Sequence, residues 1–177
     1  MRYCDDFIVM FQFENEAKMF YEVLKKRLMQ FNLELEENKT RIIPFGRLKG
    51  SKETFDFLGF THIKGKTRRG KYLVKHITSK KKMKAKRQEF KTWMKENMHN
   101  PIVEIMETIK KKLIGHYNYY GINNNSVLLC KYYQYVKLTT YRILNRRHQK
   151  RSMTYEQFER IWNGLKIPSP RIKVNIG

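Results

Sequence analysis

Two adjacent carboxylates near the start of the chain, Asp5 and Asp6, are the residues whose types and spacing best suit chemistry. Tyr3 precedes them and the uncharged run 7–11 follows. Aromatic and β-branched flanks favour strands, whereas Asp favours turns, so the pattern predicts a β-hairpin with the acids at its turn. Carboxylates this close repel each other unless a cation lies between them, and Mg²⁺ takes hard oxygen ligands of this kind. The pair therefore indicates phosphoryl transfer with two metal ions, with an ordinary solvated turn as the alternative.

The charge of the chain is distributed unevenly. Its 177 residues include 38 Lys and Arg against 16 Asp and Glu, a net charge of +22. Residues 1–60 hold ten of each sign, so the whole excess lies in residues 61–177. This partition indicates a polyanionic partner, and nucleic acid fits best. No stretch approaches the length of an apolar spanning helix and no signal or lipidation pattern is present, so no membrane partner is predicted.

The cysteines and histidines give no metal or redox signature. Cys4 and Cys130 lie far apart without a CxxC pattern, and the five histidines are scattered. We therefore predict no zinc site, and expect both cysteines to be reduced thiols in a cytoplasmic protein.

The chain predicts an α+β fold in two domains. In residues 1–77, an amphipathic helix over 14–31 follows the hairpin. Short strands over 33–35, 39–43 and 55–60 and a basic hairpin over 61–75 come next.

Residues 78–177 predict a helical domain, with the bundle itself spanning 78–165. We expect helices from 80 to 97, from Asn100-Pro101 onward, and from 126 to 146. A capping box at Thr154 and Gln157 predicts the start of a last helix that ends near residue 163.

Six segments, in order from Arg2 to Ile172, resemble the signatures of group II intron reverse transcriptases. They are Arg2-Tyr3-Cys4-Asp5-Asp6-Phe7, the L-x-L-x-x-x-K-T stretch Leu33 to Thr40, Phe57-Leu58-Gly59-Phe60, the G-H-Y-x-Y-Y-G stretch Gly115 to Gly121, Leu144-Asn145-Arg146-Arg147 with Lys150-Arg151-Ser152, and Pro168-x-Pro170-Arg171-Ile172. Cys4 stands where alanine is commoner in the family, and this small residue should change little.

The resemblance implies a partial palm over residues 1–77 and a thumb, or maturase, domain over 78–177. Such enzymes are magnesium-dependent nucleotidyltransferases of mobile elements, which copy RNA into DNA and assist RNA splicing. Their fingers and first part of the palm, with a further metal-binding aspartate, precede the Asp-Asp turn. This chain begins at the turn, so we expect a truncated enzyme that is inactive as a polymerase by itself. A separate polypeptide supplying the missing parts is then a further partner, besides intron RNA, template RNA and a DNA primer.

The resemblance also implies roles for individual residues. Asp5 would be a metal ligand and Asp6 its electrostatic neighbour, at a site for two Mg²⁺ ions in the complete enzyme. Lys39 would lie near the leaving group of the incoming nucleotide, with a solvated surface lysine as the alternative. The primer grip would be formed by Phe57, Leu58 and Gly59, of which the first two equally suit a core.

The predicted RNA-binding residues lie in the helical domain. They are Lys80, Lys81, Lys82, Tyr117, Tyr119, Tyr120, Arg146, Arg147, Lys150 and Arg151. The tyrosines offer flat faces for bases but also suit helix packing, and we expect at least one in the core. Trp93 and Trp162 are expected in the core, and His116 is expected to be structural, with donation to a phosphate as the alternative.

Two alternatives remain open from the sequence. One is a non-catalytic, RNA-binding splicing cofactor in which the Asp-Asp turn is vestigial. The other is a truncated relic without function. In each case we expect the palm part to leave apolar surface and strand edges uncovered, and the helical part to be more robust.

Overall fold

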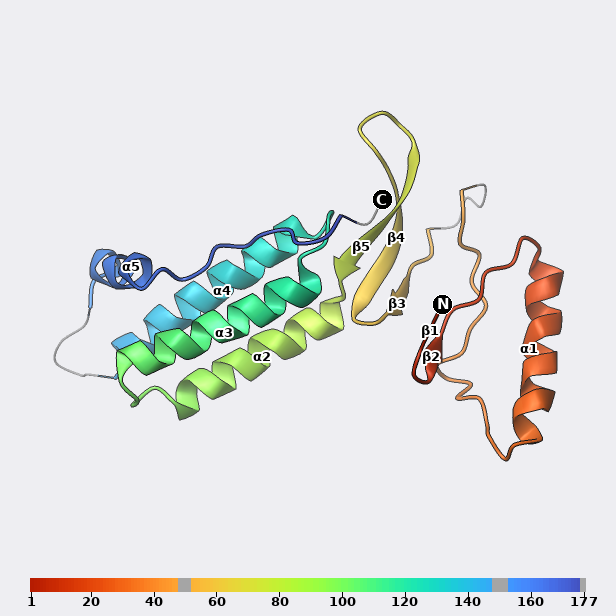
Figure 1. Cartoon of the computed structure of the whole chain (residues 1–177), viewed down its shortest axis with the longest axis horizontal. Coiled ribbons are helices and arrows are strands. Elements are labelled where there is room, and N and C mark those ends of the chain that lie inside the picture. Colours follow the sequence, from red (N-terminus) through yellow and green to blue (C-terminus); the bar gives the residue numbers. More distant parts are fainter. Residues whose placement is uncertain (48–51, 148–152, 176–177) are drawn as a thin grey trace. The chain divides into compact units, whose positions relative to one another are not determined.

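The computed structural model describes residues 1–47, 52–147 and 153–175, and shows a mixed α+β chain (Figure 1). The chain forms two compact units. Unit 1 comprises Met1–Phe57 with Ile63–Val74, and unit 2 comprises Leu58–His62 with Lys75–Gly177. The boundary passes through one β-hairpin, so it does not fall at a single point of the chain.

Unit 1 contains little regular structure. Its elements are the antiparallel pair β1 (Arg2–Tyr3) and β2 (Asp6–Phe7), the helix α1 (Glu14–Met29) and the strand β3 (Phe55–Phe57). The strands β4 (Phe60–Lys66) and β5 (Tyr72–Thr78) complete a sheet of order β3-β4-β5. The predicted hairpin over 61–75 is thus confirmed, whereas the strand predicted over 55–60 is interrupted by a turn at residues 58–59.

The strands predicted over 33–35 and 39–43 are wrong, because these residues form turns and irregular backbone. The carbonyl oxygen of Glu36 accepts hydrogen bonds from the backbone N–H groups of Lys39 and Thr40, at 3.0 and 2.9 Å. The Thr40 hydroxyl donates to the same oxygen at 3.0 Å. Such local bonds compete with strand pairing, and an alternating apolar pattern does not reveal them.

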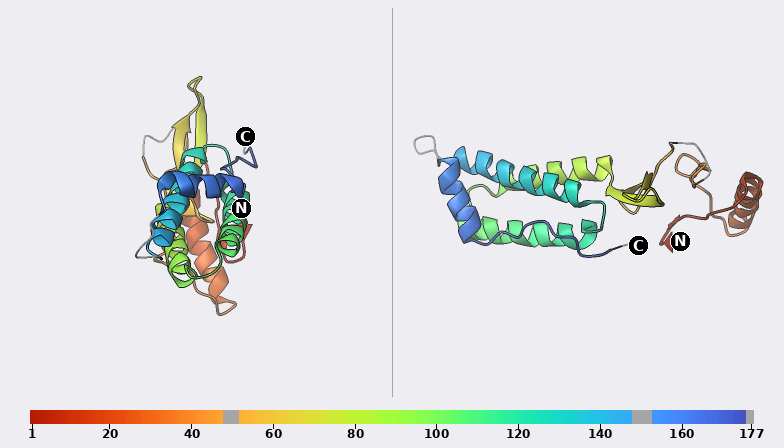
Figure 2. Two further views of the ribbon diagram at one scale, coloured as in Figure 1. Left: turned by 90° about the vertical axis from the view of Figure 1, so that its left-hand side faces the viewer. Right: turned by 90° about the horizontal axis from the view of Figure 1, so that it is seen from above.

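Unit 2 is a bundle of three long helices with a fourth at one end (Figures 1 and 2). The helices are α2 (Lys80–Glu96), α3 (Ile102–Tyr120), α4 (Ser126–Asn145) and α5 (Tyr155–Gly164). The capping box that begins α5 is confirmed: Thr154 N–H donates to Gln157 Oε1 at 3.0 Å, and Gln157 N–H donates to Thr154 Oγ1 at 3.3 Å. The side chains that fill the core include Phe90, Met94, Ile109, Leu113, Leu129, Val136, Phe158 and Trp162. Trp162 is therefore a core residue as expected, and Trp93 is only half-buried against that core.

A buried asparagine joins three elements of unit 2. Asn125 is fully buried, and its amide NH₂ donates to Thr78 Oγ1 and to the carbonyl oxygen of Tyr120, both at 2.8 Å. Its side-chain oxygen accepts from Thr78 N–H at 3.0 Å. The end of β5, the end of α3 and the start of α4 are thereby fixed together.

The segment after α5 returns beside α3 (Figure 2). The backbone N–H groups of Lys173 and Val174 donate to the carbonyl oxygen of Gly121, at 2.6 and 3.1 Å. A Cβ at position 121 would lie 2.9 Å from the carbonyl oxygen of Arg171. Only glycine therefore lets the returning segment approach this closely.

Candidate catalytic turn and nucleic-acid interface

The Asp-Asp segment forms a short hairpin in unit 1. Tyr3 pairs with Asp6 and Arg2 with Phe7, so Cys4 and Asp5 occupy the turn and Asp6 begins β2. Cys4 has φ 50°, the left-handed conformation that tight hairpin turns require. Arg2 Nε donates to the carbonyl oxygen of Cys4 at 3.0 Å and holds the turn. Both carboxylates are exposed.

This pair alone does not fit Mg²⁺. The ion requires near-octahedral oxygen coordination, usually shared between carboxylates and a phosphate-bearing substrate. Within residues 1–47, 52–147 and 153–175, no group of three or more His, Cys, Asp or Glu side chains is placed to hold a metal. Asp5 and Asp6 are therefore at most a part of a metal site, and further ligands would have to come from outside the described residues.

Lys39 is an exposed residue of a turn in unit 1, where its N–H donates to the carbonyl oxygen of Glu36 at 3.0 Å. In the part of the chain that the structure describes, no ion pair joins Lys39 to Asp5 or Asp6. Its predicted position near a nucleotide leaving group stays a prediction.

The turn predicted as a primer grip is held by unit 2. Leu58 and Gly59 have φ 49° and 80°, and Tyr119 Oη donates to the carbonyl oxygen of Leu58 at 2.8 Å. A Cβ on Gly59 would lie 3.1 Å from Tyr120 Oη. Glycine is thus required here by its conformation and by a tyrosine of the same unit. Phe57 at the end of β3 is buried, as a core residue would be.

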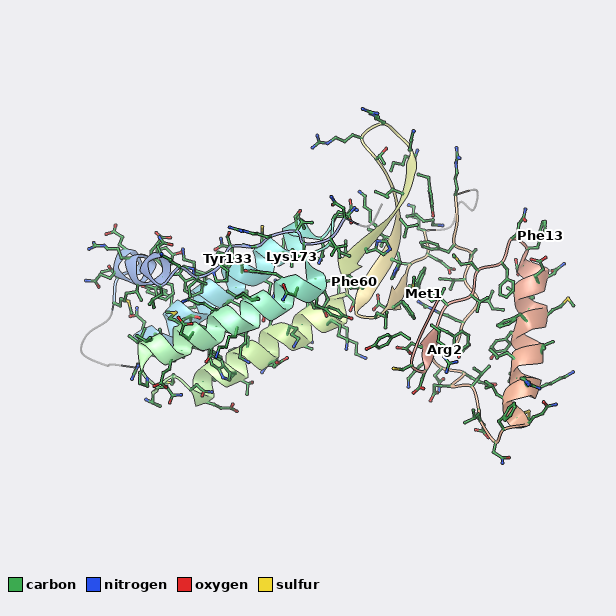
Figure 3. All side chains as sticks on the ribbon, viewed as in Figure 1. Met1, Arg2, Phe13, Phe60, Tyr133 and Lys173 are labelled. Carbon is green, nitrogen blue, oxygen red and sulfur yellow. The ribbon has the colours of Figure 1, made fainter. Side chains whose placement is uncertain are left out.

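The three tyrosines of the Gly115 to Gly121 stretch divide between core and surface. Tyr117 and Tyr120 are buried, and Tyr117 Oη donates to the carbonyl oxygen of Pro168 at 3.2 Å. Burial raises the pKa of both phenols, so both remain neutral. Tyr119 is 53% exposed, and its ring is stacked on that of Phe60. Phe60 lies beside the end of α3 (Figure 3). The expectation that at least one of these tyrosines lies in the core is confirmed, and of the three Tyr119 is the one whose ring is exposed to a base.

His116 lies inside the bundle. Its ring is stacked on Tyr132, with centroids 4.1 Å apart, and neither ring nitrogen has a hydrogen-bond partner. Burial, and to a smaller extent the nearby charge of Lys86, lower the pKa of the imidazole to about 4. His116 is therefore neutral at pH 7 and has the structural role expected from the sequence.

The first turn of α2 carries three exposed lysines, Lys80, Lys81 and Lys82, and no acid. The side chain of Ser79 caps this end, where it accepts from Lys82 N–H at 3.3 Å. The N-terminus of a helix carries partial positive charge and binds anions well, so three cations there oppose the helix dipole. A bound phosphate would offset this repulsion, which makes these lysines the strongest phosphate-binding candidates in the described residues.

The second predicted basic cluster is partly structural. Arg147 donates from Nη1 to the carbonyl oxygen of Asn100 at 3.0 Å and from Nη2 to that of His99 at 2.7 Å. Its guanidinium therefore joins the end of α4 to the α2–α3 loop. Arg146 is exposed and remains available to a phosphate. Lys150 and Arg151 lie outside the described residues.

Sequence reasoning missed the two asparagines that organise unit 2. Asn145 donates to the carbonyl oxygen of Met153 at 3.0 Å and accepts from Met153 N–H at 2.6 Å. Asn125 forms the buried network described above. The one available signal was position: each lies at an end of α4, where a polar side chain finds unpaired backbone groups.

Comparisons of the chain with family models, with curated proteins and with solved structures found no match. No helix within the described ranges is both long enough and apolar enough to cross a lipid bilayer.

Proposed function

We propose that the chain supplies the catalytic turn and the nucleic-acid-binding helices of an RNA-directed DNA polymerase of the group II intron type. The observation that carries the proposal is the tight hairpin in which Asp5 and Asp6 stand exposed at and beside the turn. Two adjacent, exposed carboxylates repel each other, and a divalent cation bound between them would remove that repulsion.

The charge of unit 2 supports a nucleic-acid partner. The excess of basic residues lies after residue 60, mostly in unit 2, and Lys80, Lys81 and Lys82 are gathered where a helix N-terminus already favours phosphate. In this proposal unit 2 binds intron RNA, template RNA and the primer in the cytoplasm. Its lysines contact phosphates, so they contribute affinity with little sequence preference.

The chain by itself catalyses no nucleotide transfer in this proposal. Asp5 and Asp6 cannot complete a site for Mg²⁺ alone, so a polypeptide bearing fingers and a further acidic ligand must complete it. The apolar surface of unit 1 is consistent with such a partner, since Met10, Met19 and Val23 are 90%, 69% and 63% exposed.

Primer extension tests the proposal, with the chain mixed with a separately produced fingers and palm fragment. Asp5→Asn keeps the shape of the side chain and removes its charge, so extension should fall about 100-fold or more. Glu22→Gln, at an exposed position of α1, makes the same chemical change away from the turn and should leave extension unchanged. Equal extension by the Asp5→Asn and unaltered chains contradicts the assignment.

A second candidate is a non-catalytic RNA-binding splicing cofactor. The observation that favours it is that unit 2 has a complete core of its own, whereas the acidic pair is incomplete. If this candidate holds, Asp5→Asn with Asp6→Asn leaves RNA-assisted splicing intact, while Lys80, Lys81 and Lys82 changed together to Gln weaken it.

A further inference from the structure

A shallow apolar groove lies where α4 passes Arg87 of α2, wholly within unit 2. Its volume is about 570 Å³, and its wall includes Val127, Cys130, Leu138 and Tyr135 from α4. Neither the Asp-Asp turn nor the lysines at the start of α2 contribute to it. The groove is therefore separate from the residues that carry the proposed function.

The helix α4 is apolar on two sides. Leu129 and Val136 belong to the core, as their burial shows. Val127, Cys130 and Leu138 recur at helical spacing on another side, and Val127 is 62% exposed and Leu138 38% exposed. One apolar stripe is enough to hold a helix on its bundle. A second, exposed stripe that borders a groove marks a surface for another molecule.

Arg87 gives this groove a chemical preference. Its guanidinium contributes a positive charge to the wall and lies over the Tyr135 ring, 5.2 Å from the ring centroid. A carboxylate is the acceptor that best matches a guanidinium. Lys131 adds a second positive charge, and no acid contributes to the wall.

We infer that this groove binds an acidic amphipathic helix of a protein partner. The apolar side chains of that helix would lie against Val127 and Leu138, and one of its carboxylates would accept from Arg87. A nucleic-acid backbone fits less well, because its phosphates and sugars cover an apolar stripe poorly. The partner thus has the opposite charge to this chain but is recognised through its apolar face.

Fluorescence anisotropy with a synthetic peptide tests the inference on the full chain. The probe is a labelled helical peptide of about 16 residues, with leucines at i, i+3, i+4 and i+7 and glutamates beside them. A second peptide of equal charge has serines in place of the leucines. Any acidic peptide is attracted to a chain of net charge +22, and the serine peptide measures that attraction alone.

The chain offers a matched pair of exposed valines for control. Val127 borders the groove and is 62% exposed, whereas Val103, in the first turn of α3, is 58% exposed. Val127→Asp should weaken binding of the leucine peptide about tenfold or more, and Val103→Asp should change it less than about twofold. The serine peptide should bind all three chains equally weakly.

Arg87→Met tests the carboxylate directly. This variant should lose about tenfold in affinity for the glutamate peptide and almost nothing for the same peptide with glutamines. Equal binding by the leucine and serine peptides, or equal effects of Val127→Asp and Val103→Asp, overturns the inference. Loss of binding to a single-stranded RNA oligonucleotide on Val127→Asp, with peptide binding unchanged, also overturns it and assigns the groove to nucleic acid.

Discussion

The two units of this chain differ in how much of their apolar surface they bury. The 16-residue helix α1 of unit 1 has no buried residue, whereas the 19-residue helix α3 of unit 2 has seven. Among the described residues, the buried hydrophobic side chains include Phe57 from unit 1 and otherwise come from unit 2. Apolar residues at helical spacing therefore form a core in unit 2, where three helices pack together. The same kind of pattern in α1 of unit 1 leaves its apolar side chains exposed.

This difference in packing bears on the two proposed roles, the catalytic turn in unit 1 and the nucleic-acid-binding helices in unit 2. Unit 2 holds its exposed lysines on helices that are packed against a complete core. Unit 1 holds Asp5 in the turn and Asp6 at the start of β2, in a hairpin whose strands of two residues each are too short to be stable alone. We expect the acidic turn to depend on a partner, and the basic helices to be functional without one.

The largest expected effect comes from one substitution made in both units. Met94 in α2 is fully buried and Met19 in α1 is 69% exposed. Met94→Ala should lower the free energy of unfolding of unit 2 by about 2–5 kcal/mol, because it leaves a cavity. Met19→Ala, in unit 1, should change the free energy of unfolding of the chain by less than about 0.5 kcal/mol. Urea denaturation followed by circular dichroism measures both, and equal effects would remove the contrast between the units.

The buried imidazole predicts a pH dependence that belongs to unit 2. The pKa of His116 is about 4 in the folded chain and 6.5 when unperturbed, so the unfolded chain binds the proton more readily. The stability that this group contributes is complete above pH 6.5 and is lost as the pH falls to about 4, by up to about 3 kcal/mol.

Thermal unfolding between pH 4 and 7 measures this dependence. His116→Phe should flatten the part of the curve between pH 4 and 6.5. His99→Phe, at an exposed position of the α2–α3 loop, should leave the curve as it is. A curve that His116→Phe does not alter would show that the imidazole is not held neutral by the core.

The asparagine network predicts a somewhat smaller loss. Asn125→Ala leaves Thr78 N–H and the carbonyl oxygen of Tyr120 without their side-chain partner, so it should destabilise unit 2 by about 1–3 kcal/mol. Asn118→Ala, at an exposed position of α3, should have no measurable cost. Similar melting temperatures for the two variants would mean that water replaces the network.

The smallest expected effect has opposite signs at the two ends of α2. Lys81→Glu places an acid at the helix N-terminus and should stabilise unit 2 by about 0.3–1 kcal/mol, while it weakens RNA binding. Lys95→Glu, in the last turn, should destabilise by a similar amount. Melting temperatures at low salt and RNA binding over a salt series measure both quantities. A loss of stability on Lys81→Glu would contradict the proposal that these lysines are unfavourable with the helix dipole and are present to bind a phosphate.

The sequence predicted the helices well because their signals are periodic or local. The helix over 126–146 ends one residue earlier than expected, and the capping box at Thr154 is present. The prediction of strands over 33–35 and 39–43 was wrong, because local hydrogen bonds to the carbonyl oxygen of Glu36 hold that segment in turns.

The candidate site was harder to predict residue by residue. Tyr117, Tyr119 and Tyr120 have the same chemistry, and only the packing of α3 shows which of them is exposed. Arg147 has the composition of a phosphate ligand, yet it binds two backbone carbonyl groups. Spacing along a helix does not distinguish a surface cation from one that is used in a tertiary contact.

Amide hydrogen exchange of the whole chain, followed by mass spectrometry, tests most directly whether unit 2 is stable by itself while unit 1 lacks a packing partner. The account predicts slow exchange throughout α3 and α4 and fast exchange in α1, because α1 buries none of its side chains. Protection of α1 equal to that of α3 would contradict it.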